Sequence, residues 1–273
     1  MEKRIEIISN ISELNEFIND TNKYLVIIDL DDFLIRGSDT LGSDIWYRSN
    51  LEKGRSRKNV IKNMYYVYSV MKYQPIEDDT IEIINSISSR KNVDLIIQTA
   101  RSIKFYSHTV KHLCDAGLGS LIKPNILSIP HYIYDSNMNV RYMDNVIYCD
   151  GNPKDDILEH VLKCLPRLSK TYDTIIFGDD SISNVNDMHN KFMTSKTYKP
   201  MNTYAIHYSY MEMTKRKYND DTLINDDQKM QYLKYVIMCM NGKLKLDYVL
   251  TTNVFITISL FWWFIFKFVG LIM

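Results

Sequence analysis

The chain has 273 residues, which is enough for one large domain or for one domain with additional segments. Apolar residues make up 45% of the sequence and charged residues 24%, the usage of an ordinary globular protein that can bury a sizeable core. The 33 basic residues balance the 33 acidic residues, so nothing in the net charge favours nucleic acid as a partner.

The first half of the chain alternates between apolar runs and segments with helical spacing. In chain order we predict a helix near 12–20, a buried strand at 24–29, a long and mostly helical segment at 43–73, a helix within 75–90, a buried strand at 93–99 and a helix within 103–117. The strands are short, continuous and rich in β-branched residues, as in strands buried on both faces. Gly117 is predicted to end the last of these helices, because glycine readily adopts the left-handed conformation of a helix C-terminus.

The same alternation continues in the second half. We predict a hairpin over 131–151 that turns at Asp135–Asn137, a helix capped by Asn152 with Pro153 at its first position, a buried strand within 172–180, a helix over 181–193, a strand over 203–210 and polar helices from about 214 to 242. This alternation predicts an α/β fold, a three-layer Rossmann-like domain with a mainly parallel sheet and helices on both faces. Ligands of such sheets bind outside the carboxyl ends of the strands.

Side chains with useful chemistry gather at these carboxyl ends. They are the acids of "DLDD" (Asp29 to Asp32), Thr99, Arg101 and Ser102 of "QTARS", Lys154 of "GNPKDD", and Asp179 and Asp180 of "FGDDS". Several carboxylates in one cleft repel each other unless a cation lies between them. Mg²⁺ is the natural cation, because it prefers hard oxygen ligands and substrate phosphate completes its shell. With a lysine and a hydroxyl nearby to hold phosphate oxygens, these residues predict metal-assisted phosphoryl chemistry with a carboxylate nucleophile.

The ordered set "IIDLDD", "IIQTARS", "PKDDIL" and "IIFGDD" resembles the four motifs of the haloacid dehalogenase (HAD) superfamily of phosphohydrolases. The resemblance covers roughly residues 20 to 210, and "LGSDIWYRS" after the first motif is similar to a little-studied bacterial branch of unassigned function. A single acidic D-x-D after an apolar strand is common by chance. Four such motifs in this order, each at a strand end or a helix start, are much more specific.

The resemblance implies a role for each motif residue. Asp29 would be the nucleophile that forms an aspartyl-phosphate, Asp31 the general acid and base, Thr99 a hydrogen-bond donor to the phosphoryl group, and Lys154 the cation that neutralises charge. The implied ligands of Mg²⁺ are Asp29, Asp31 through its backbone carbonyl, Asp179 and Asp180. Arg101 and Ser102 are the candidates for binding substrate phosphate.

Each of these residues also has a purely structural interpretation. Asp29 and Asp31 could end a strand and cap a turn, Thr99 and Asp180 could cap helices, Arg101 could form a surface salt bridge, and Lys154 could be solvated. Lys154 lies just inside a helix N-terminus, where the helix dipole disfavours a cation, and this placement favours a functional role. Asp32 is expected to be a turn residue that faces solvent.

The segment from about residue 38 to 74 lies between the first two motifs and is too long for a simple loop. In the resemblance it takes the place of a small helical cap inserted after the first strand, a lid that excludes water and selects the substrate. The candidates for substrate contact from this cap are Trp46, Tyr47, Arg48, Arg55 and Arg57.

One position departs from the family pattern. The superfamily usually has threonine or valine two residues after the acid/base residue, giving D-x-D-x-T, and this chain has Phe33 there. The threonine makes a turn contact rather than a bond to substrate. A bulky ring at this position therefore puts the orientation of Asp31, and with it the activity, in question more than the fold.

The C-terminal stretch "VFITISLFWWFIFKFVGLIM", Val254 to Met273, carries one charge, Lys267, over 20 residues. This length suits a bilayer core of roughly 30 Å, so we expect a single-pass membrane anchor with the preceding domain in the cytosol. A buried core helix is the alternative. Four cysteines without a C-x-x-C pair fit a reducing compartment. The expected organisation is a HAD-like domain at 1–213, a helical linker at 214–250 and a C-terminal transmembrane helix at 251–273.

Together these features predict a Mg²⁺-dependent phosphatase of the HAD type that hydrolyses a phosphomonoester and is tethered to a membrane through residues 254–273. Its substrate would be a phosphorylated small molecule or lipid, and no nucleic acid is expected. The rival hypothesis, which Phe33 motivates, is a non-catalytic membrane-anchored binding module that keeps the fold. A Mg²⁺-dependent nuclease using the same acids is a third hypothesis, which the neutral net charge disfavours.

Overall fold

The computed structural model describes residues 2–123, 126–127, 140–165 and 171–240 of the chain. The chain divides into two compact units, Met1–Asp227 and Gln228–Met273. The first unit contains every strand that the described residues form, together with the candidate site. Of the second unit, the structure describes residues 228–240, the C-terminal part of one helix.

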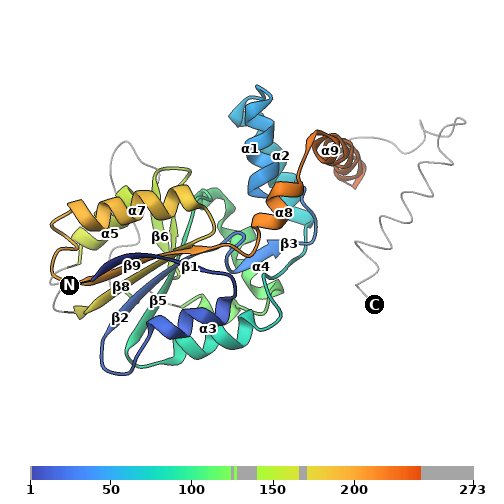
Figure 1. Cartoon of the computed structure of the whole chain (residues 1–273). Helices are drawn as coiled ribbons and strands as arrows, with labels where there is room; N and C mark the ends of the chain where they lie inside the picture. Colours follow the sequence, from blue (N-terminus) through green and yellow to red (C-terminus); the bar gives the residue numbers. More distant parts are fainter. Residues whose placement is uncertain (1, 124–125, 128–139, 166–170, 241–273) are drawn as a thin grey trace, which may run out of the picture. The chain divides into compact units, whose positions relative to one another are not determined.

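A seven-stranded sheet forms the middle layer of the first unit (Figure 1). Its strands are β1 (Lys3–Ile8), β2 (Tyr24–Asp29), β5 (Val93–Thr99), β6 (Arg141–Met143), β7 (Val146–Tyr148), β8 (Thr174–Asp179) and β9 (Asn202–Tyr208). Their order is β1-β9-β8-β2-β5-β7-β6, and neighbours are parallel except β6 with β7. The central strand β2 is buried along all six residues, as its continuous apolar sequence predicts. The predicted α/β class with a mainly parallel sheet is confirmed.

Helices cover both faces of this sheet. They are α3 (Thr80–Ser89), α4 (Tyr106–Asp115), α5 (Lys154–Lys163) and α7 (Ile182–Thr194), with the short 3-10 helices η1 (Ile11–Phe17), η2 (Ile103–Phe105) and η3 (Gly119–Leu121). Helices α5 and α7 pack on each other on one face, and α3 lies with η1 on the other (Figure 1). Connections between parallel strands are right-handed, so the direction in which the chain moves along the sheet decides which face a connecting helix covers. The chain first moves from β2 to β5 and β7, and then reverses to β8 and β9, so its helices cover both faces.

A small helical insertion follows β2, in the place of the predicted cap. Its base is the antiparallel pair β3 (Ile35–Gly37) and β4 (Tyr73–Pro75), and its body is α1 (Asp44–Glu52) and α2 (Arg57–Val70). The Ser43 and Ser56 hydroxyls cap these helices by accepting hydrogen bonds from the Trp46 and Asn59 backbone N–H groups. This cap follows the second strand of the chain rather than the first, because β1 precedes β2.

Strand β1 is an element that the sequence analysis does not predict. It lies at the sheet edge, where Arg4 and Glu6 interrupt its apolar residues and Ile7 is 66% exposed. Such a strand lacks both the continuous apolar run and the clean alternation that mark buried strands. The sequence just after it forms η1, a 3-10 helix that begins with a capping box of Asn10 and Glu13, rather than the predicted helix near 12–20.

Local structure also differs from prediction at a turn and at a helix start. The hairpin of β6 and β7 turns at Asp144–Asn145, which have φ of 51° and 65°, as in the two-residue turns whose twist matches the strands. The turn predicted at Asp135–Asn137 lies outside the described residues. Asn152 does not cap α5, because its side chain donates to the Cys149 carbonyl, and Pro153 takes the cap position.

Phe33, the residue that departs from the family pattern, lies in the core. Its ring is fully buried, and its centroid is 4.8 Å from that of Tyr208 in β9. Gly178 of β8 makes room for it, because a Cβ there would lie 2.8 Å from Phe33 Cε2. The bulky side chain is therefore accommodated by packing against β8 and β9.

The C-terminal part of the described chain is helical, as predicted, with α8 (Glu212–Lys217) and α9 (Asp220–Met240). Among the described residues, which end at 240, no helix has the length and apolar character needed to cross a membrane. The predicted anchor at 251–273 lies outside them and stays a prediction.

Candidate active site

The candidate site lies at the carboxyl ends of β2, β5 and β8, where the strand order reverses. Strand β2 ends at Asp29, and the chain then turns tightly, with the Leu34 and Ile35 N–H groups both donating to the Leu30 carbonyl. Asp32 donates its N–H to the Ile35 carbonyl (2.9 Å) and adopts a left-handed φ of 62°. Aspartate tolerates this conformation better than most residues, so the turn can carry several carboxylates close together.

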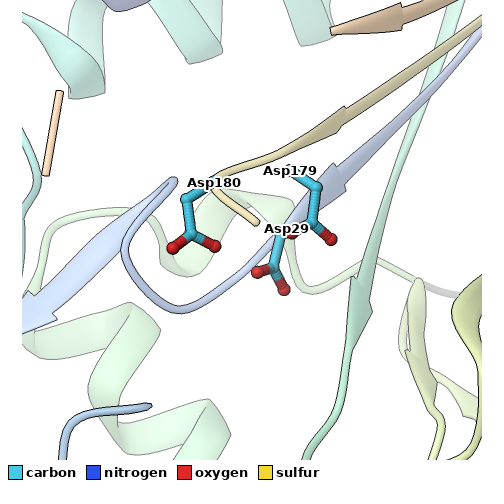
Figure 2. A group of neighbouring side chains, drawn as sticks. All are labelled: Asp29, Asp179 and Asp180. Carbon is cyan, nitrogen blue, oxygen red and sulfur yellow. The ribbon is translucent and has the colours of Figure 1, made fainter. Parts of the chain in front are cut away.

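Three carboxylates meet at the floor of the site (Figure 2). Asp29 from β2, Asp179 from β8 and the adjacent Asp180 each offer an oxygen, and these oxygens lie within 4.8 Å of one another. The ammonium of Lys154, the first residue of α5, lies 2.6 Å from Asp29 Oδ1 and 2.7 Å from Asp179 Oδ2. Lys154 is buried, so it is not the solvated lysine of the structural interpretation. We call these four residues the acidic floor.

The chain itself does not balance the charges of the acidic floor. Burial raises the pKa of Asp29 well above its ordinary value; Lys154 opposes this rise, and the neighbouring Asp179 and Asp180 add to it. Burial disfavours the charge on Lys154, yet Asp179 and Asp29 outweigh burial and raise the pKa of this ammonium. The 2.6 Å contact supports a charged Asp29–Lys154 pair. Lys154 thus only partly offsets burial and the repulsion from Asp179 and Asp180, so the pKa of Asp29 stays raised.

This donor set fits a small, hard divalent cation. Carboxylate oxygens are the ligands that Mg²⁺ prefers, and Asp29, Asp179 and Asp180 can supply one each. A cation there would add the positive charge that the floor lacks. The side chain of Asp31 is not part of this group.

Asp179 and Asp180 have different surroundings. Asp179 is fully buried and accepts hydrogen bonds from the Ser181 N–H (2.9 Å) and from Asn184 Nδ2 (3.0 and 3.1 Å). Asp180 is in contact with the ammonium of Lys215 in α8. Asp180 does not cap the following helix, because Ser181 takes that position.

Lys215 is a site residue that the sequence analysis missed. Its ammonium contacts Asp180 and lies 3.8 Å from Asp32 Oδ2. Asp32 does not face solvent, contrary to the prediction, but is buried. Burial and then repulsion from Asp180 raise its pKa to about 7, although the Lys215 ammonium opposes this rise. No sequence signal marks Lys215, because it follows Asp180 by 35 positions in a polar segment and reaches the site only through the fold.

Asp31 is held by a different cation. Its two carboxylate oxygens accept hydrogen bonds from Arg101, at 2.8 Å from Nε and 2.6 Å from Nη2. Arg101 is buried, whereas the Asp31 side chain is 30% exposed. Arg101 therefore forms a salt bridge, but inside the site rather than on the surface, and it occupies both oxygens of the proposed acid/base residue.

Side chains of α4 and of the cap support Arg101 from behind. Arg101 Nη1 donates to Thr109 Oγ1 (3.2 Å) and to His112 Nδ1 (3.1 Å), and the guanidinium lies 4.5 Å from the Tyr68 ring centroid. Because arginine has no acceptor, His112 accepts at Nδ1, and its Nε2–H donates to the Tyr68 carbonyl at 2.9 Å. Burial, and then the charge of Arg101, lower the pKa of His112 to about 3, so this imidazole is neutral. Tyr73 of β4 stacks on it at 3.8 Å.

The other two motif residues are Thr99, the last residue of β5, and Ser102, in the turn that follows. The buried Thr99 hydroxyl accepts the Arg101 N–H at 3.1 Å and so shapes this turn, without capping a helix. Ser102 is the residue that caps η2, by accepting the Lys104 N–H at 3.4 Å. Ser102 also lines the cavity that adjoins the acidic floor.

This cavity has a volume of about 650 Å³ and is bounded by the core and the cap, within the usual range of roughly 300–1,000 Å³ for small-molecule sites. Of the cap residues predicted to contact substrate, Tyr47, Arg48 and Arg57 line it. Trp46 is fully buried inside the cap, and Arg55 pairs with Asp227 instead. Aromatic size and positive charge alone do not separate these two groups in the sequence.

The fold and the acidic floor define a Rossmann-like α/β protein with a candidate metal site at the carboxyl edge of its sheet. The model of the family described as "Protein of unknown function (DUF2608)" matches residues 7–240, and the chain belongs to this family. No curated protein matches the chain.

Several solved structures are distantly similar to the chain. The class C acid phosphatase from Bacillus anthracis is 13% identical, covering 80% of this chain and 81% of that one, with a TM-score of 0.36. A haloacid dehalogenase-like protein of unknown function from Agrobacterium tumefaciens is 15% identical over 80% and 98%, with a TM-score of 0.36. A putative beta-phosphoglucomutase from Thermotoga maritima is 14% identical over 71% and 100%, with a TM-score of 0.34. Scores this low do not assign a fold or a reaction, which rest on the geometry of this chain.

Proposed function

We propose that the chain is a Mg²⁺-dependent phosphatase of the HAD type, which hydrolyses a phosphomonoester through an aspartyl-phosphate on Asp29. The observation that carries this proposal is the buried Asp29–Lys154–Asp179 group with Asp180 beside it. A carboxylate and an anionic phosphate repel each other, so the attack requires positive charge close to both groups. The acidic floor offers an ammonium and a set of metal ligands for that purpose.

In this mechanism an oxygen of Asp29 attacks the phosphorus atom. Asp29 Oδ1 is engaged by Lys154 and by the Leu30 N–H (2.7 Å), so Oδ2 is the better placed of the two. The phosphorus–ester oxygen bond breaks as the bond to Asp29 forms, and the leaving alkoxide takes a proton from the Asp31 carboxyl group. Water then attacks the aspartyl-phosphate and gives a proton to Asp31, which releases inorganic phosphate and restores the Asp29 carboxylate.

Lys154 supplies the fixed positive charge of this site. It lies against Asp29 and reduces the repulsion between the carboxylate and the incoming phosphate. Asp29, Asp179, Asp180 and the backbone carbonyl of Asp31 would hold Mg²⁺. When bound, Mg²⁺ supplies the charge that stabilises the phosphoryl oxygens in the transition state.

Residues at the end of β5 and in the turn after it would orient the substrate. We assign Thr99 to hydrogen bonding with the phosphoryl group and Ser102 to substrate contact at the cavity wall. Arg101 has five N–H donors, and four of them bond to Asp31, Thr109 and His112, so one Nη2–H is left that could bind substrate phosphate while both bonds to Asp31 stay in place.

Substitution of Asp29 by asparagine tests the mechanism. In the full-length chain with Mg²⁺, hydrolysis of an aryl phosphate should fall by about 1,000-fold or more, because an amide does not form the acyl phosphate. Asp187→Asn, at an exposed acid of α7, is the matched control and should keep full activity. Chelation of Mg²⁺ should also remove activity from the unmodified protein. An Asp29→Asn variant as active as the unmodified protein would exclude Asp29 as the nucleophile.

A non-catalytic, membrane-anchored module of the same fold is the second candidate function. The Arg101–Asp31 pair favours it, since a general acid must be free to lose and regain a proton. Beryllofluoride, a mimic of phosphate on aspartate, separates the two candidates. An enzyme should bind beryllofluoride at Asp29 in the presence of Mg²⁺. A folded chain that binds neither beryllofluoride nor Mg²⁺ would be the non-catalytic module.

We also infer that residues 254–273 tether the chain to a membrane, with the preceding domain in the cytosol. The support is the sequence, 20 residues with one charge. Deleting these residues should move the protein from the membrane fraction to the soluble fraction, and an unchanged distribution would exclude the tether. A tethered site would have access to a phosphorylated lipid as well as to a phosphorylated small molecule.

A further inference from the structure

A group of lysines that the proposed mechanism does not use borders the cavity. Lys58 and Lys62 of α2 and Lys104 of η2 are exposed and line the cavity, so they lie at its mouth. We call these three the mouth lysines. Their positions are not explained by stability of the helix. Lys58 lies in the first turn of α2, where the helix dipole favours acids, and Lys58 and Lys62 are like charges four residues apart.

The mouth lysines come from two elements that are packed together. Lys58, Lys62 and Tyr65 are spaced by four and three residues, so they share one face of α2. The Tyr65 ring lies 6.4 Å from the Phe105 ring, centroid to centroid, and Phe105 is the neighbour of Lys104. The cap and the core therefore place their lysines around one opening.

Within the described part of the chain, the mouth lysines have no ion-pair partner. The acids of the cap that line the same cavity are engaged elsewhere. Asp44 pairs with Arg48 at 2.7 Å, and Asp39 accepts the Leu41 N–H at 3.2 Å. Asp29, Asp32 and Asp180 lie at the acidic floor with Lys154 and Lys215, and Asp31 pairs with Arg101. Asp150, whose carbonyl accepts from Arg57, also lines the cavity. The mouth thus keeps an uncompensated positive charge.

We propose that the mouth lysines bind a second anionic group of the substrate, so that the substrate is a small phosphomonoester that carries another phosphate. The inference rests on the proposed function for the phosphate that reacts at Asp29. Tyr47, Met64 and Tyr65 line the wall and offer contact area to the carbon skeleton. Arg57, at the N-terminus of α2, donates to the Asp150 carbonyl at 3.4 Å and stands beside the mouth lysines as a fourth cation.

A series of α,ω-alkanediol bisphosphates of increasing length, each with its matching alkyl monophosphate, tests this subsite. The full-length protein with Mg²⁺ should show a kcat/KM about tenfold higher for the best bisphosphate than for its monophosphate, since three exposed lysines each contribute modestly. The preference should shrink as salt is raised. The triple variant Lys58→Gln, Lys62→Gln, Lys104→Gln should lose the preference and keep the kcat/KM for the monophosphate.

The control is a second triple variant, Lys91→Gln, Lys196→Gln, Lys199→Gln, which removes the same charge at exposed positions outside the cavity lining. It should keep the preference. Loss of the preference in the control, or equal hydrolysis of both compounds by the unmodified protein, would overturn the subsite and leave the proposed function standing. A chain that hydrolyses neither compound but binds the bisphosphate tenfold more tightly through the mouth lysines, by calorimetry, would overturn the proposed function and keep the subsite.

The second phosphate could belong to a free metabolite or to a lipid headgroup, and vesicles distinguish these sources. Phosphate release is measured from phosphatidylcholine vesicles with and without a phosphoinositide bisphosphate. Release that depends on the mouth lysines would assign the two phosphates to a headgroup. Dependence on these lysines with the soluble compounds alone would assign them to a free small molecule, and dependence with neither would overturn the proposal.

Discussion

The two aspartates of the turn after β2 are held by two cations in two different ways. Asp29 lies against Lys154 in the acidic floor, where Lys154 and Lys215 are two ammonium groups for three carboxylates. Asp31, two residues later, meets Arg101 in a matched pair of one carboxylate and one guanidinium with two hydrogen bonds. The acidic floor lacks positive charge, whereas the Asp31–Arg101 pair is complete.

This difference separates a part of the site that requires a ligand from a part that folding alone completes. A buried group with too little positive charge gains free energy from a bound cation, and a satisfied pair does not. The supports differ as well. The acidic floor rests on strands and α5, while the Tyr68 ring on Arg101 and the Tyr73 ring beside it tie the Asp31–Arg101 pair to the cap. A movement of the cap would therefore affect Asp31 before it affects Asp29.

The largest effect is expected at Lys154. Lys154→Met leaves Asp29 and Asp179 buried without their shared ammonium, and breaking a buried ion pair in this way costs on the order of 3–5 kcal/mol of the free energy of unfolding. Denaturant unfolding with and without Mg²⁺ measures it. Mg²⁺ should restore part of the lost stability, because the cation replaces the missing charge.

Lys163→Met is the matched control at the other end of α5. Its ammonium is largely exposed and pairs with Glu159 at 3.0 Å, so its loss should change stability little. Equal losses for the two variants would mean that the acidic floor is not short of positive charge. The contrast between the two regions would then disappear.

A smaller effect is expected at the complete pair. A double-mutant cycle of Arg101→Met and Asp31→Asn should give a coupling energy of about 1–2 kcal/mol in the free energy of unfolding, because Asp31 is partly exposed and water screens the pair. Mg²⁺ should not change this coupling, in contrast to the rescue expected at Lys154. The exposed Arg48–Asp44 pair is the control cycle and should couple more weakly. A coupling energy that depends on Mg²⁺ would show that the Asp31–Arg101 pair and the acidic floor are energetically linked.

The core of the fold could be predicted because its strands are continuous apolar runs and its helices begin and end with clear signals. Strand β2 and Gly117, which has a φ of 75° after α4, are such cases. Strand β1 was not predictable in the same way, because a charged edge strand depends on its pairing with β9 rather than on its own pattern. Asn152 shows a local limit, since its side chain donates to the Cys149 carbonyl three residues earlier instead of capping the helix.

The acidic floor could be predicted because parallel strands bring their carboxyl ends to one edge. Asp29 and Asp179 end neighbouring strands, so their proximity follows from the sheet. The Arg101–Asp31 pair depends on the register that sets Asp29 opposite Gln98, which the sequence does not reveal. Lys215 reaches the site from a helix beyond β9, a contact that only the tertiary fold creates.

The smallest expected effect is at Lys215, which brings positive charge to the edge of the acidic floor. Its ammonium contacts Asp180 and repels a cation that binds there, so Lys215→Gln should tighten Mg²⁺ binding by about three- to tenfold. Calorimetric titration of the full-length chain with Mg²⁺ measures the change.

The control is Lys217→Gln, at an exposed lysine of the same helix, which should leave Mg²⁺ affinity unchanged. If Lys215→Gln instead weakens Mg²⁺ binding, Lys215 orients Asp180 for the metal rather than competing with it. Lys215 and Asp180 would then form a complete pair, and the shortage of positive charge in the acidic floor would be confined to Asp29, Asp179 and Lys154. Tighter Mg²⁺ binding in Lys215→Gln, but not in Lys217→Gln, would show that the Lys215 ammonium competes with Mg²⁺ for Asp180.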